Sequence, residues 1–339
     1  MITRTAPSWH TEDWQFLLSS SIRCPETLWK RLQLPLHTLP AGLQGHGMFP
    51  LRVPEPYLDK IKPGDLEDPL LKQVLPVSAE SESRPGFITD PLGERLANPQ
   101  SGLLHKYQSR VLLVLSGACA INCRYCFRRH FPYQDNRLSS QDFAGIEAYL
   151  FQHPEVNEVI LSGGDPLVVS NARIGKLLNI MEKVPTVSRL RIHTRLPVVI
   201  PQRVDAGLIN SLANTRLNCV LVTHSNHPDE LDPVFDQAML ALREVGVHLL
   251  NQAVLLRGVN DDASVLANLS ERLFQAGVLP YYLHLLDPVA GAHHFDVPEG
   301  EARKLMHSLH QQLPGFLIPR LVREISGKSG NTPIDMHLS

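Results

Sequence analysis

The chain has 339 residues and a hydrophobic content of 43%, enough apolar material for one large folded domain with an appendage. Lysine and arginine number 32 against 34 aspartates and glutamates, so the net charge of −2 provides no positive field that would attract nucleic acid. The opening residues lack the apolar segment of a signal peptide, and no apolar run elsewhere approaches a bilayer span. We therefore expect a cytoplasmic protein that contacts neither nucleic acid nor a membrane.

Residues 1–104 are rich in proline, and we expect them to form a mainly helical cap region. Helical stretches are expected at Asp13 to Ser20 and at Glu26 to Leu32. Prolines such as those of the following Val53-Pro-Glu-Pro stop helices and bias the preceding residue toward extended geometry. The remainder of this region should therefore consist of short elements separated by turns.

In residues 105–315, short β-rich runs alternate with longer helical stretches. Strands are expected at Val111–Leu115, Glu158–Leu161, Arg189–Thr194, Cys219–Thr223, His248–Val254 and Pro280–Leu285. Helices are expected at Gln141–Gln152, Ile174–Lys183, Asp205–Ala213, Pro233–Val245, Ala263–Ala276 and Glu299–Gln312. Six such units predict an α/β fold whose parallel sheet curls into a partial (β/α)6 barrel similar to a TIM barrel.

Three cysteines follow the first predicted strand, in the run Cys119-Ala-Ile-Asn-Cys123-Arg-Tyr-Cys126. Cysteine thiolates hold iron–sulfur clusters, and three of them leave one iron of a 4Fe-4S cluster open to a further ligand. The alternative is a structural zinc site, which needs four ligands and would require a histidine such as His105 or His130. A disulfide framework does not suit five cysteines in a chain of this length. The pattern favours a catalytic cluster in a reducing compartment.

The segment Ser162-Gly163-Gly164-Asp165 follows the second predicted strand. Functional groups of such barrels gather where strands end and loops begin. Two residues without side chains would let the backbone approach a ligand closely, although a tight turn is the simpler alternative. The position next to the cysteine motif favours a ligand-binding element.

Other chemistry-bearing side chains also lie near strand ends. Arg128 comes just after the cysteine motif, where its planar guanidinium is suited to a carboxylate, unless it is a solvated surface arginine. His224 ends the fourth strand, and Asp287 follows the last, either as a partner for a cation or as a helix cap. Gln252 is an amide within an apolar strand, where a ligand could satisfy its hydrogen bonds. We expect these residues to line one shared site.

Together these segments resemble the lysine 2,3-aminomutase family of radical S-adenosylmethionine enzymes. The resemblance rests on Cys-Arg-Tyr-Cys-Phe-Arg-Arg, Leu-Ser-Gly-Gly-Asp-Pro-Leu, Leu-Leu-Asn-Gln-Ala-Val-Leu-Leu-Arg and Pro-Tyr-Tyr-Leu-His. The closer match is to the bacterial branch that makes β-lysine for elongation factor P, through Leu-Leu-His-Lys-Tyr and Cys-Phe-Arg-Arg-His-Phe-Pro-Tyr. The resemblance covers nearly the whole chain.

The resemblance implies an isomerase that converts L-α-lysine to (R)-β-lysine. Its cofactors would be a 4Fe-4S cluster, S-adenosylmethionine and pyridoxal phosphate, which carry the difficult chemistry while the protein positions them. The pathway partners would be elongation factor P and its lysyl ligase. In such an enzyme, the reduced cluster cleaves S-adenosylmethionine to start radical chemistry, and pyridoxal phosphate carries the migrating amino group.

The resemblance also assigns roles to individual residues. Arg128 would bind the carboxylate of lysine, whereas Asp287 and Glu324 would face its ε-ammonium group. Residues 316–339 would form a C-terminal segment that closes the pyridoxal phosphate and substrate site. The residues assigned to the cluster are Cys119, Cys123 and Cys126, and those assigned to S-adenosylmethionine are Ser162, Gly163, Gly164, Asp165, His224 and Gln252.

One position departs from the family pattern. The lysine that binds pyridoxal phosphate in relatives aligns with Asn331, and an amide cannot condense with an aldehyde as an amine does. Lys328 lies three residues away, up to about 10 Å along an extended chain, and is the candidate replacement. Otherwise pyridoxal phosphate binds without a lysine or is absent. The alternatives for function are then a catalytically impaired homologue that acts as a regulatory partner, or a radical enzyme that acts on another amino acid.

Overall fold

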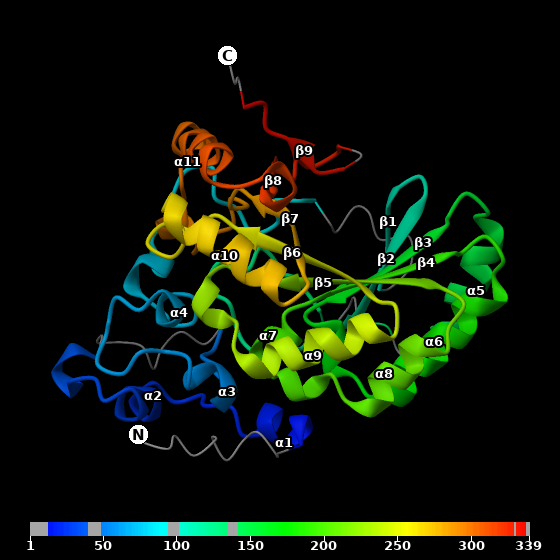
Figure 1. Cartoon of the computed structure of the whole chain (residues 1–339), viewed down its shortest axis with the longest axis horizontal. Coiled ribbons are helices and arrows are strands. Elements are labelled where there is room, and N and C mark those ends of the chain that lie inside the picture. The colour runs from blue at the N-terminus through cyan, green and yellow to red at the C-terminus, as the bar shows by residue number, and fades with distance from the viewer. Residues whose placement is uncertain are drawn as a thin grey trace.

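The computed structural model describes residues 13–39, 49–93, 102–133, 138, 142–328 and 330–336. Through these residues runs a single sheet of nine strands whose spatial order follows the chain (Figure 1). The parallel strands are β2 (Arg110–Ser116), β3 (Glu158–Gly163), β4 (Arg189–Thr194), β5 (Asn218–His224), β6 (His248–Val254), β7 (Leu279–His284) and β8 (Arg320–Arg323). At the two ends of the sheet, β1 (Leu103–Tyr107) and β9 (Thr332–Pro333) add antiparallel.

The predicted partial barrel is confirmed, since the six expected strands correspond to β2 through β7. The sheet is longer than the sequence predicts, because β1, β8 and β9 extend it at both ends. β1 begins at Leu103 inside the expected cap region, and β8 and β9 belong to the expected C-terminal segment. Both flanking segments therefore contribute backbone to the barrel.

Helices cover the outside of the curved sheet, as Figure 1 shows for α5, α6, α8, α9 and α10. Several begin at an aspartate whose carboxylate accepts a backbone N–H of the first turn, as Asp232 does from Phe235 over 2.7 Å. The predicted start of α5 at Gln141 lies outside the described residues. The helices of the barrel are α5 (Phe143–Gln152), α6 (Asn171–Lys183), α7 (Leu196–Val199), α8 (Ala206–Ala213), α9 (Pro233–Glu244), α10 (Ala263–Gln275) and α11 (Glu299–Gln312).

Short helices in the first part of the chain lie beside α7, at one end of the barrel (Figure 1). They are α1 (Trp14–Ser19), α2 (Pro25–Arg31), α3 (Glu55–Leu58) and α4 (Pro69–Lys72). Three of the four have proline within their first two positions, where the missing N–H costs no hydrogen bond. No helix among the described residues has the length and apolarity to cross a bilayer.

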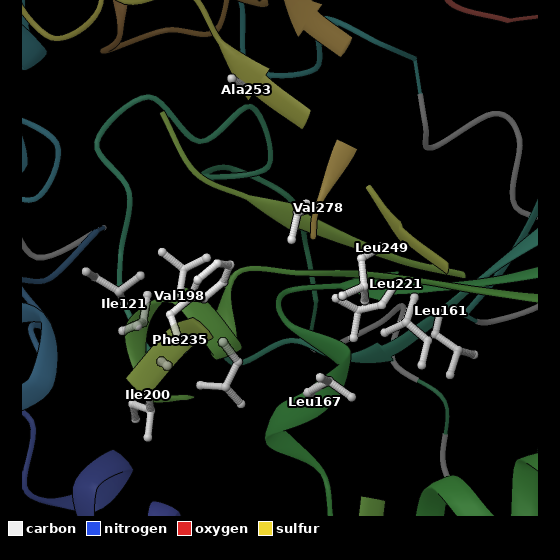
Figure 2. Packing of buried hydrophobic residues seen from close by; sticks show 14 of the residues in the cluster. Ile121, Leu161, Leu167, Val198, Ile200, Leu221, Phe235, Leu249, Ala253 and Val278 are labelled. Atoms are coloured by element: carbon white, nitrogen blue, oxygen red, sulfur yellow. The ribbon is translucent and has the colours of Figure 1, made fainter. Parts of the chain in front are cut away.

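The apolar core lies between the sheet and its helices. Leu161, Leu221 and Leu249, all at most 5% exposed, lie together on one side of the sheet, near Leu167 (Figure 2). Successive residues of a strand point to opposite faces, so the residues that alternate with these leucines along β3, β5 and β6 line the inside of the barrel. That inner face is only partly buried and carries polar side chains, namely Arg191, His193, His224, Gln252 and His284.

Candidate active site

The loop after β2 carries the three cysteines. The Cys126 amide donates a hydrogen bond to the Cys123 carbonyl over 3.0 Å, and the Arg129 amide donates to the Cys126 carbonyl over 3.1 Å. Arg52 holds the start of the loop, since its Nη1 donates to the Cys119 carbonyl over 2.8 Å. The loop therefore winds tightly around the cysteines and is tied to the N-terminal part of the chain.

The chemistry of these thiols fits an iron–sulfur cluster. Burial and the neighbouring cysteines raise the pKa of Cys119 well above its usual value, and they raise the pKa of Cys126 to about 11. Thiolates at this site therefore need positive charge beside them, which bound iron supplies. Three thiols on one loop would occupy three irons of a 4Fe-4S cluster and leave the fourth open.

The two histidines proposed to complete a zinc site have other partners. His105 Nδ1 hydrogen-bonds the hydroxyl of Tyr149 at 2.8 Å, and His130 Nε2 donates to the carbonyl of Ala290 at 3.0 Å. Zinc would therefore lack the fourth ligand that the sequence offers for it. Within the part of the chain that the structure describes, no three His, Cys, Asp or Glu side chains, the three cysteines included, already stand in the geometry of a metal site.

The two glycines after β3 let the backbone approach the cysteine loop. Gly163 has a φ of +124°, and a Cβ there would lie 2.5 Å from the Ser116 carbonyl oxygen. A Cβ on Gly164 would lie 2.4 Å from the Ala118 carbonyl oxygen. Hydrogen bonds of 2.7 Å from the Gly164 amide to Ser116 and of 2.8 Å from the Asp165 amide to Ala118 join the segments. The close approach of the cysteine loop therefore requires both glycines, whether or not they contact a ligand. Their binding of S-adenosylmethionine stays a prediction.

Asp165 joins the ends of β3 and β4. Its buried carboxylate accepts a hydrogen bond of 2.7 Å from the Thr194 hydroxyl and bonds of 2.8 and 2.9 Å from the amides of Arg195 and Leu196. Burial raises the pKa of this carboxyl, and the hydrogen bonds oppose the rise. Asp165 thus binds the end of β4 through its side chain and the cysteine loop through its backbone amide.

Arg128 lies over the end of β3. The residue is only 7% exposed. Its Nη1 donates to the Ser162 hydroxyl at 3.0 Å and to the Gly163 carbonyl at 3.1 Å. The Tyr133 hydroxyl donates to the same carbonyl at 2.8 Å. The guanidinium is therefore held in place beside the predicted cofactor residues and is not a solvated surface charge.

A buried cation that the sequence did not predict, Arg195, lies against Cys123. Arg195 Nη1 donates to the Cys123 sulfur at 2.7 Å and also contacts the Tyr125 hydroxyl. Its Nη2 donates to Glu230 Oε2 and to Gln73 Oε1, both at 2.8 Å. Since neither charged residue is more than 7% exposed, Glu230 balances the charge of Arg195 and fixes its guanidinium as a hydrogen-bond donor to Cys123, a predicted cluster ligand.

The phenol of Tyr125 connects this network to His224. Its oxygen accepts hydrogen bonds from Arg195 and from Asn226 Nδ2, the latter at 2.7 Å. Its single proton can then be donated to His224 Nε2 at 3.0 Å, a shorter contact than the 3.4 Å to Gln73. Burial, followed by the charge of Arg195, holds the pKa of His224 well below its usual value. His224 is therefore neutral, and its Nε2 accepts a hydrogen bond from the phenol.

The inner face of the barrel continues this neutral polar lining. Gln252 lies beside His224 in the parallel register of β5 and β6. Burial lowers the pKa of His193 well below its usual value and that of His284 to about 4. His193 Nε2 is buried without a hydrogen-bond partner among the described residues. A polar ligand beside these side chains would meet uncharged donors and acceptors, with Arg191 and Arg128 as the charged neighbours of His193.

The residues assigned to the substrate ammonium and to pyridoxal phosphate lie near the last strands. Asp287 is half-buried in the loop after β7. Glu324 directly follows β8, and its carboxylate lies 3.5 Å from the ammonium nitrogen of Lys106. Lys328 is exposed in the turn between β8 and β9, whereas Asn331 is half-buried beside the first residue of β9. The candidate lysine of the C-terminal segment therefore faces solvent.

The sequence does not predict three residues of the site: Arg195, Glu230 and Lys106. Arg195 and Glu230 follow the ends of β4 and β5, so the strand-end rule that selected His224 could have selected them too. Lys106 had no such signal, because its partner Glu324 lies at the other end of the sheet.

Comparisons with known proteins identify the family of the chain. A sequence model described as a 4Fe-4S single cluster domain matches residues 108–191. The chain is 47% identical over its full length to an L-lysine 2,3-aminomutase of Escherichia coli, covering 98% of that protein. It is also 47% identical to an L-lysine 2,3-aminomutase of Haemophilus influenzae, with 95% of each chain covered. Among solved structures, a radical SAM methyltransferase from Sphaerobacter thermophilus aligns with a TM-score of 0.48 at 19% identity, over 65% of this chain and 68% of that one.

The partial barrel, the three-cysteine loop and the cluster-domain match define an iron–sulfur enzyme of the radical S-adenosylmethionine class. Its cofactors therefore include a 4Fe-4S cluster and S-adenosylmethionine. The chain belongs to the L-lysine 2,3-aminomutase family, a family of isomerases.

Proposed function

We propose that this protein converts L-α-lysine to (R)-β-lysine in the cytoplasm and that the product is attached to elongation factor P by a separate lysyl ligase. The full-length identity of 47% to L-lysine 2,3-aminomutases carries the proposal. The retained cysteine loop and its buried surroundings support it. The link to elongation factor P rests on the sequence motifs of that branch alone.

The chain's own residues divide the work between two regions. Cys119, Cys123 and Cys126 would hold the cluster, which together with S-adenosylmethionine supplies the radical that starts the reaction. Ser162, Gly163, Gly164 and Asp165, with His224 and Gln252, would hold S-adenosylmethionine at the carboxyl ends of β3, β5 and β6. These ends lie beside the cysteine loop, which brings both cofactors to one place.

Arg128 would bind the carboxylate of the substrate lysine. Its guanidinium is already fixed by Ser162 and Gly163, so little side-chain entropy is lost when a carboxylate is gripped bidentately. Asp287 and Glu324 would meet the ε-ammonium from β7 and β8. The neutral histidines between these two ends add no positive charge that would repel the substrate.

Pyridoxal phosphate would supply an imine that carries the migrating amino group, and its fit depends on an amine. Asn331 provides none, and the ammonium of Lys328 is in an exposed turn. A lysine and an arginine of the β1–β2 hairpin do reach this part of the site, because Lys106 meets Glu324 and Arg110 lies near Gly330. These two residues support the proposal that side chains other than the family lysine would hold the cofactor.

The proposal is tested by anaerobic incubation of cluster-reconstituted protein with dithionite, S-adenosylmethionine, pyridoxal phosphate and L-lysine. Chiral chromatography should detect (R)-β-lysine, and a Cys123→Ser control should form none because the cluster is lost. Omitting pyridoxal phosphate should abolish product. If an intact cluster cleaves S-adenosylmethionine but yields no β-lysine from lysine, the proposed activity is wrong.

Asn331 favours a second candidate, a catalytically impaired homologue that retains the cluster. An Asn331→Lys variant separates the two. Product formed only by this variant would identify the natural chain as impaired, whereas product formed by both would exclude that candidate.

A further inference from the structure

Lys106 points into the barrel from its first strand. Its neighbour His105 contacts Tyr149 of α5, which lies on the outer side of the sheet. The register of β1 with β2 shifts between Leu104 and Tyr107, so its contacts, and not strand alternation, place Lys106. Its ammonium meets Glu324, which lies two residues after Val322 and so on the face that Val322 shares with His284, the inner face. Its side chain is 17% exposed, in contrast to the exposed Lys328.

The ammonium of Lys106 reaches the far end of the sheet. Its Nζ lies 3.5 Å from the carboxylate of Glu324, which directly follows β8, and 3.4 Å from the carbonyl of Leu92. Lys106 belongs to the first strand of the sheet, while Glu324 lies beside the last two. The ion pair therefore spans the seam of the open barrel.

Asn331 lies on the same side of this seam as Glu324. In the antiparallel pairing of β8 with β9, Arg323 faces Thr332 and Val322 faces Pro333. Continuing this register by one residue sets Glu324 opposite Asn331, and directly opposed residues have Cβ atoms about 5 Å apart. The amine of Lys106 thus reaches the residue that faces the family's lysine position.

A second cation accompanies Lys106 at this seam. A Cβ on Gly330 would lie 3.7 Å from Arg110 Nη2, so the guanidinium lies against the segment that precedes Asn331. Arg110 also covers the ring of Tyr107, with its Cζ 4.0 Å from the ring centroid. A guanidinium is suited to bind a phosphate group. The seam therefore combines an amine with an anion-binding group.

We propose that Lys106 is the amine that binds the aldehyde of pyridoxal phosphate in this protein, an inference that rests on the function proposed above. Its Nζ attacks the aldehyde carbon, the nitrogen loses two protons, and the aldehyde oxygen leaves as water, so that a C=N bond replaces the C=O bond without oxidation or reduction. Glu324 is placed to accept the proton that the ammonium must lose first. Arg110 binds the phosphate.

Other lysines are less suited to this role. Lys60 is more buried, at 7%, but its ammonium contacts Val198, Glu230 and Asp232, which follow β4 and β5 and not the last strands, where Asn331 lies. Lys328 lies outside the barrel in a turn closed by the hydrogen bond of its amide to the Ile325 carbonyl. Lys106 combines an inward position with a contact to Glu324, the residue opposite the family's lysine position.

The experiment traps the bond chemically. Cluster-reconstituted protein is incubated with stoichiometric pyridoxal phosphate, reduced with sodium borohydride, which fixes an imine as a stable secondary amine, and digested for peptide mass spectrometry. The phosphopyridoxyl group should be found on the peptide that contains Lys106. Lys106→Arg, which keeps the charge opposite Glu324, should lose the label with an unchanged iron content and circular dichroism spectrum. The matched variant Lys328→Arg should keep the label.

An Asn331→Lys variant adds a test of position. If the two sites share one pocket, the new lysine should take the label and reduce that on Lys106. Label on Lys328 in the natural protein, or undiminished label in Lys106→Arg, would overturn the inference. So would formation of β-lysine with no labelled lysine, which would leave the proposed function standing. Label on Lys106 without β-lysine would retain the inference and reject the activity.

Discussion

Glu80 holds the cysteine loop to the N-terminal part of the chain. Its carboxylate accepts a hydrogen bond of 2.8 Å from Arg124 Nε and contacts a second nitrogen of that guanidinium, and it lies 2.5 Å from Arg129 Nη2. The three side chains are 4%, 1% and 7% exposed. Replacement of Glu80 by glutamine would remove the negative charge between two buried guanidinium groups while preserving the shape of the side chain.

The expected loss follows from this burial. Breaking a buried ion pair by removing one partner costs about 3 to 5 kcal/mol, and we expect the lower end because glutamine keeps one acceptor oxygen. A fold of ordinary stability, about 5 to 15 kcal/mol, should survive but be weakened measurably. Burial raises the pKa of Glu80, but Arg124 and Arg129 outweigh it and leave the pKa lowered. This contribution is therefore present above the usual range of a glutamate and is lost as the pH falls through the lowered pKa.

Urea denaturation of metal-free protein measures the free energy of unfolding. Glu82 supplies the control, because its side chain is 67% exposed and lies 3.4 Å from His293. Glu82→Gln should change stability by no more than about 0.5 kcal/mol. A loss in Glu80→Gln below about 1 kcal/mol, or equal to that of the control, would refute the reasoning.

Three further changes test the site. Arg195→Lys keeps a positive charge in the buried network but removes the guanidinium nitrogen that donates to the Cys123 sulfur. The reduction potential of the cluster should therefore fall, as measured by a redox titration followed by electron paramagnetic resonance. An unchanged potential would contradict this role. Gly164→Ala puts a Cβ 2.4 Å from the Ala118 carbonyl oxygen. It should lower the free energy of unfolding by about 1 to 3 kcal/mol in urea denaturation and reduce the iron bound per chain. A variant with normal iron content would contradict the role of Gly164 in holding the cysteine loop. Burial lowers the pKa of His284 to about 4, so between the usual histidine range and about pH 4 the unfolded chain binds more protons than the folded one. The free energy of unfolding should therefore decrease as the pH is lowered through this interval. In urea titrations at several pH values, His284→Asn should reduce this dependence on pH.

The sequence predicts the parts of this fold that local patterns encode. The strands β2 to β7 are short apolar runs between helices, so their existence and order follow from the alternation alone. β8 and β9 cover only four and two residues, and β1 is joined to β2 through an irregular register, so their pairing depends on partners already in place. These strands could not be recognised from periodicity.

The same contrast holds in the site. The cysteine motif spans a few residues and was recognisable because cluster ligands share one loop. Arg195, in contrast, is 72 residues from the sulfur that it contacts, and Lys106 meets Glu324 only because the sheet curls. The Gly163–Gly164 pair was recognised for a ligand, while the structure shows that the cysteine loop itself requires the small residues. Nonlocal contacts of this kind follow from the curvature of the sheet and not from residue spacing.

The seam between the two ends of the sheet is bridged, within the described part of the chain, by side chains and not by backbone. Among the described residues no backbone pairing joins β1 to β9, and the Lys106–Glu324 contact that bridges them is an ion pair between partly exposed side chains. Ion pairs between partly exposed side chains are worth little and weaken further in salt, whereas the hydrogen-bonded ladders on either side depend on neither charge. Added salt should therefore loosen the contact between the two ends of the sheet before it affects the pairing of the strands.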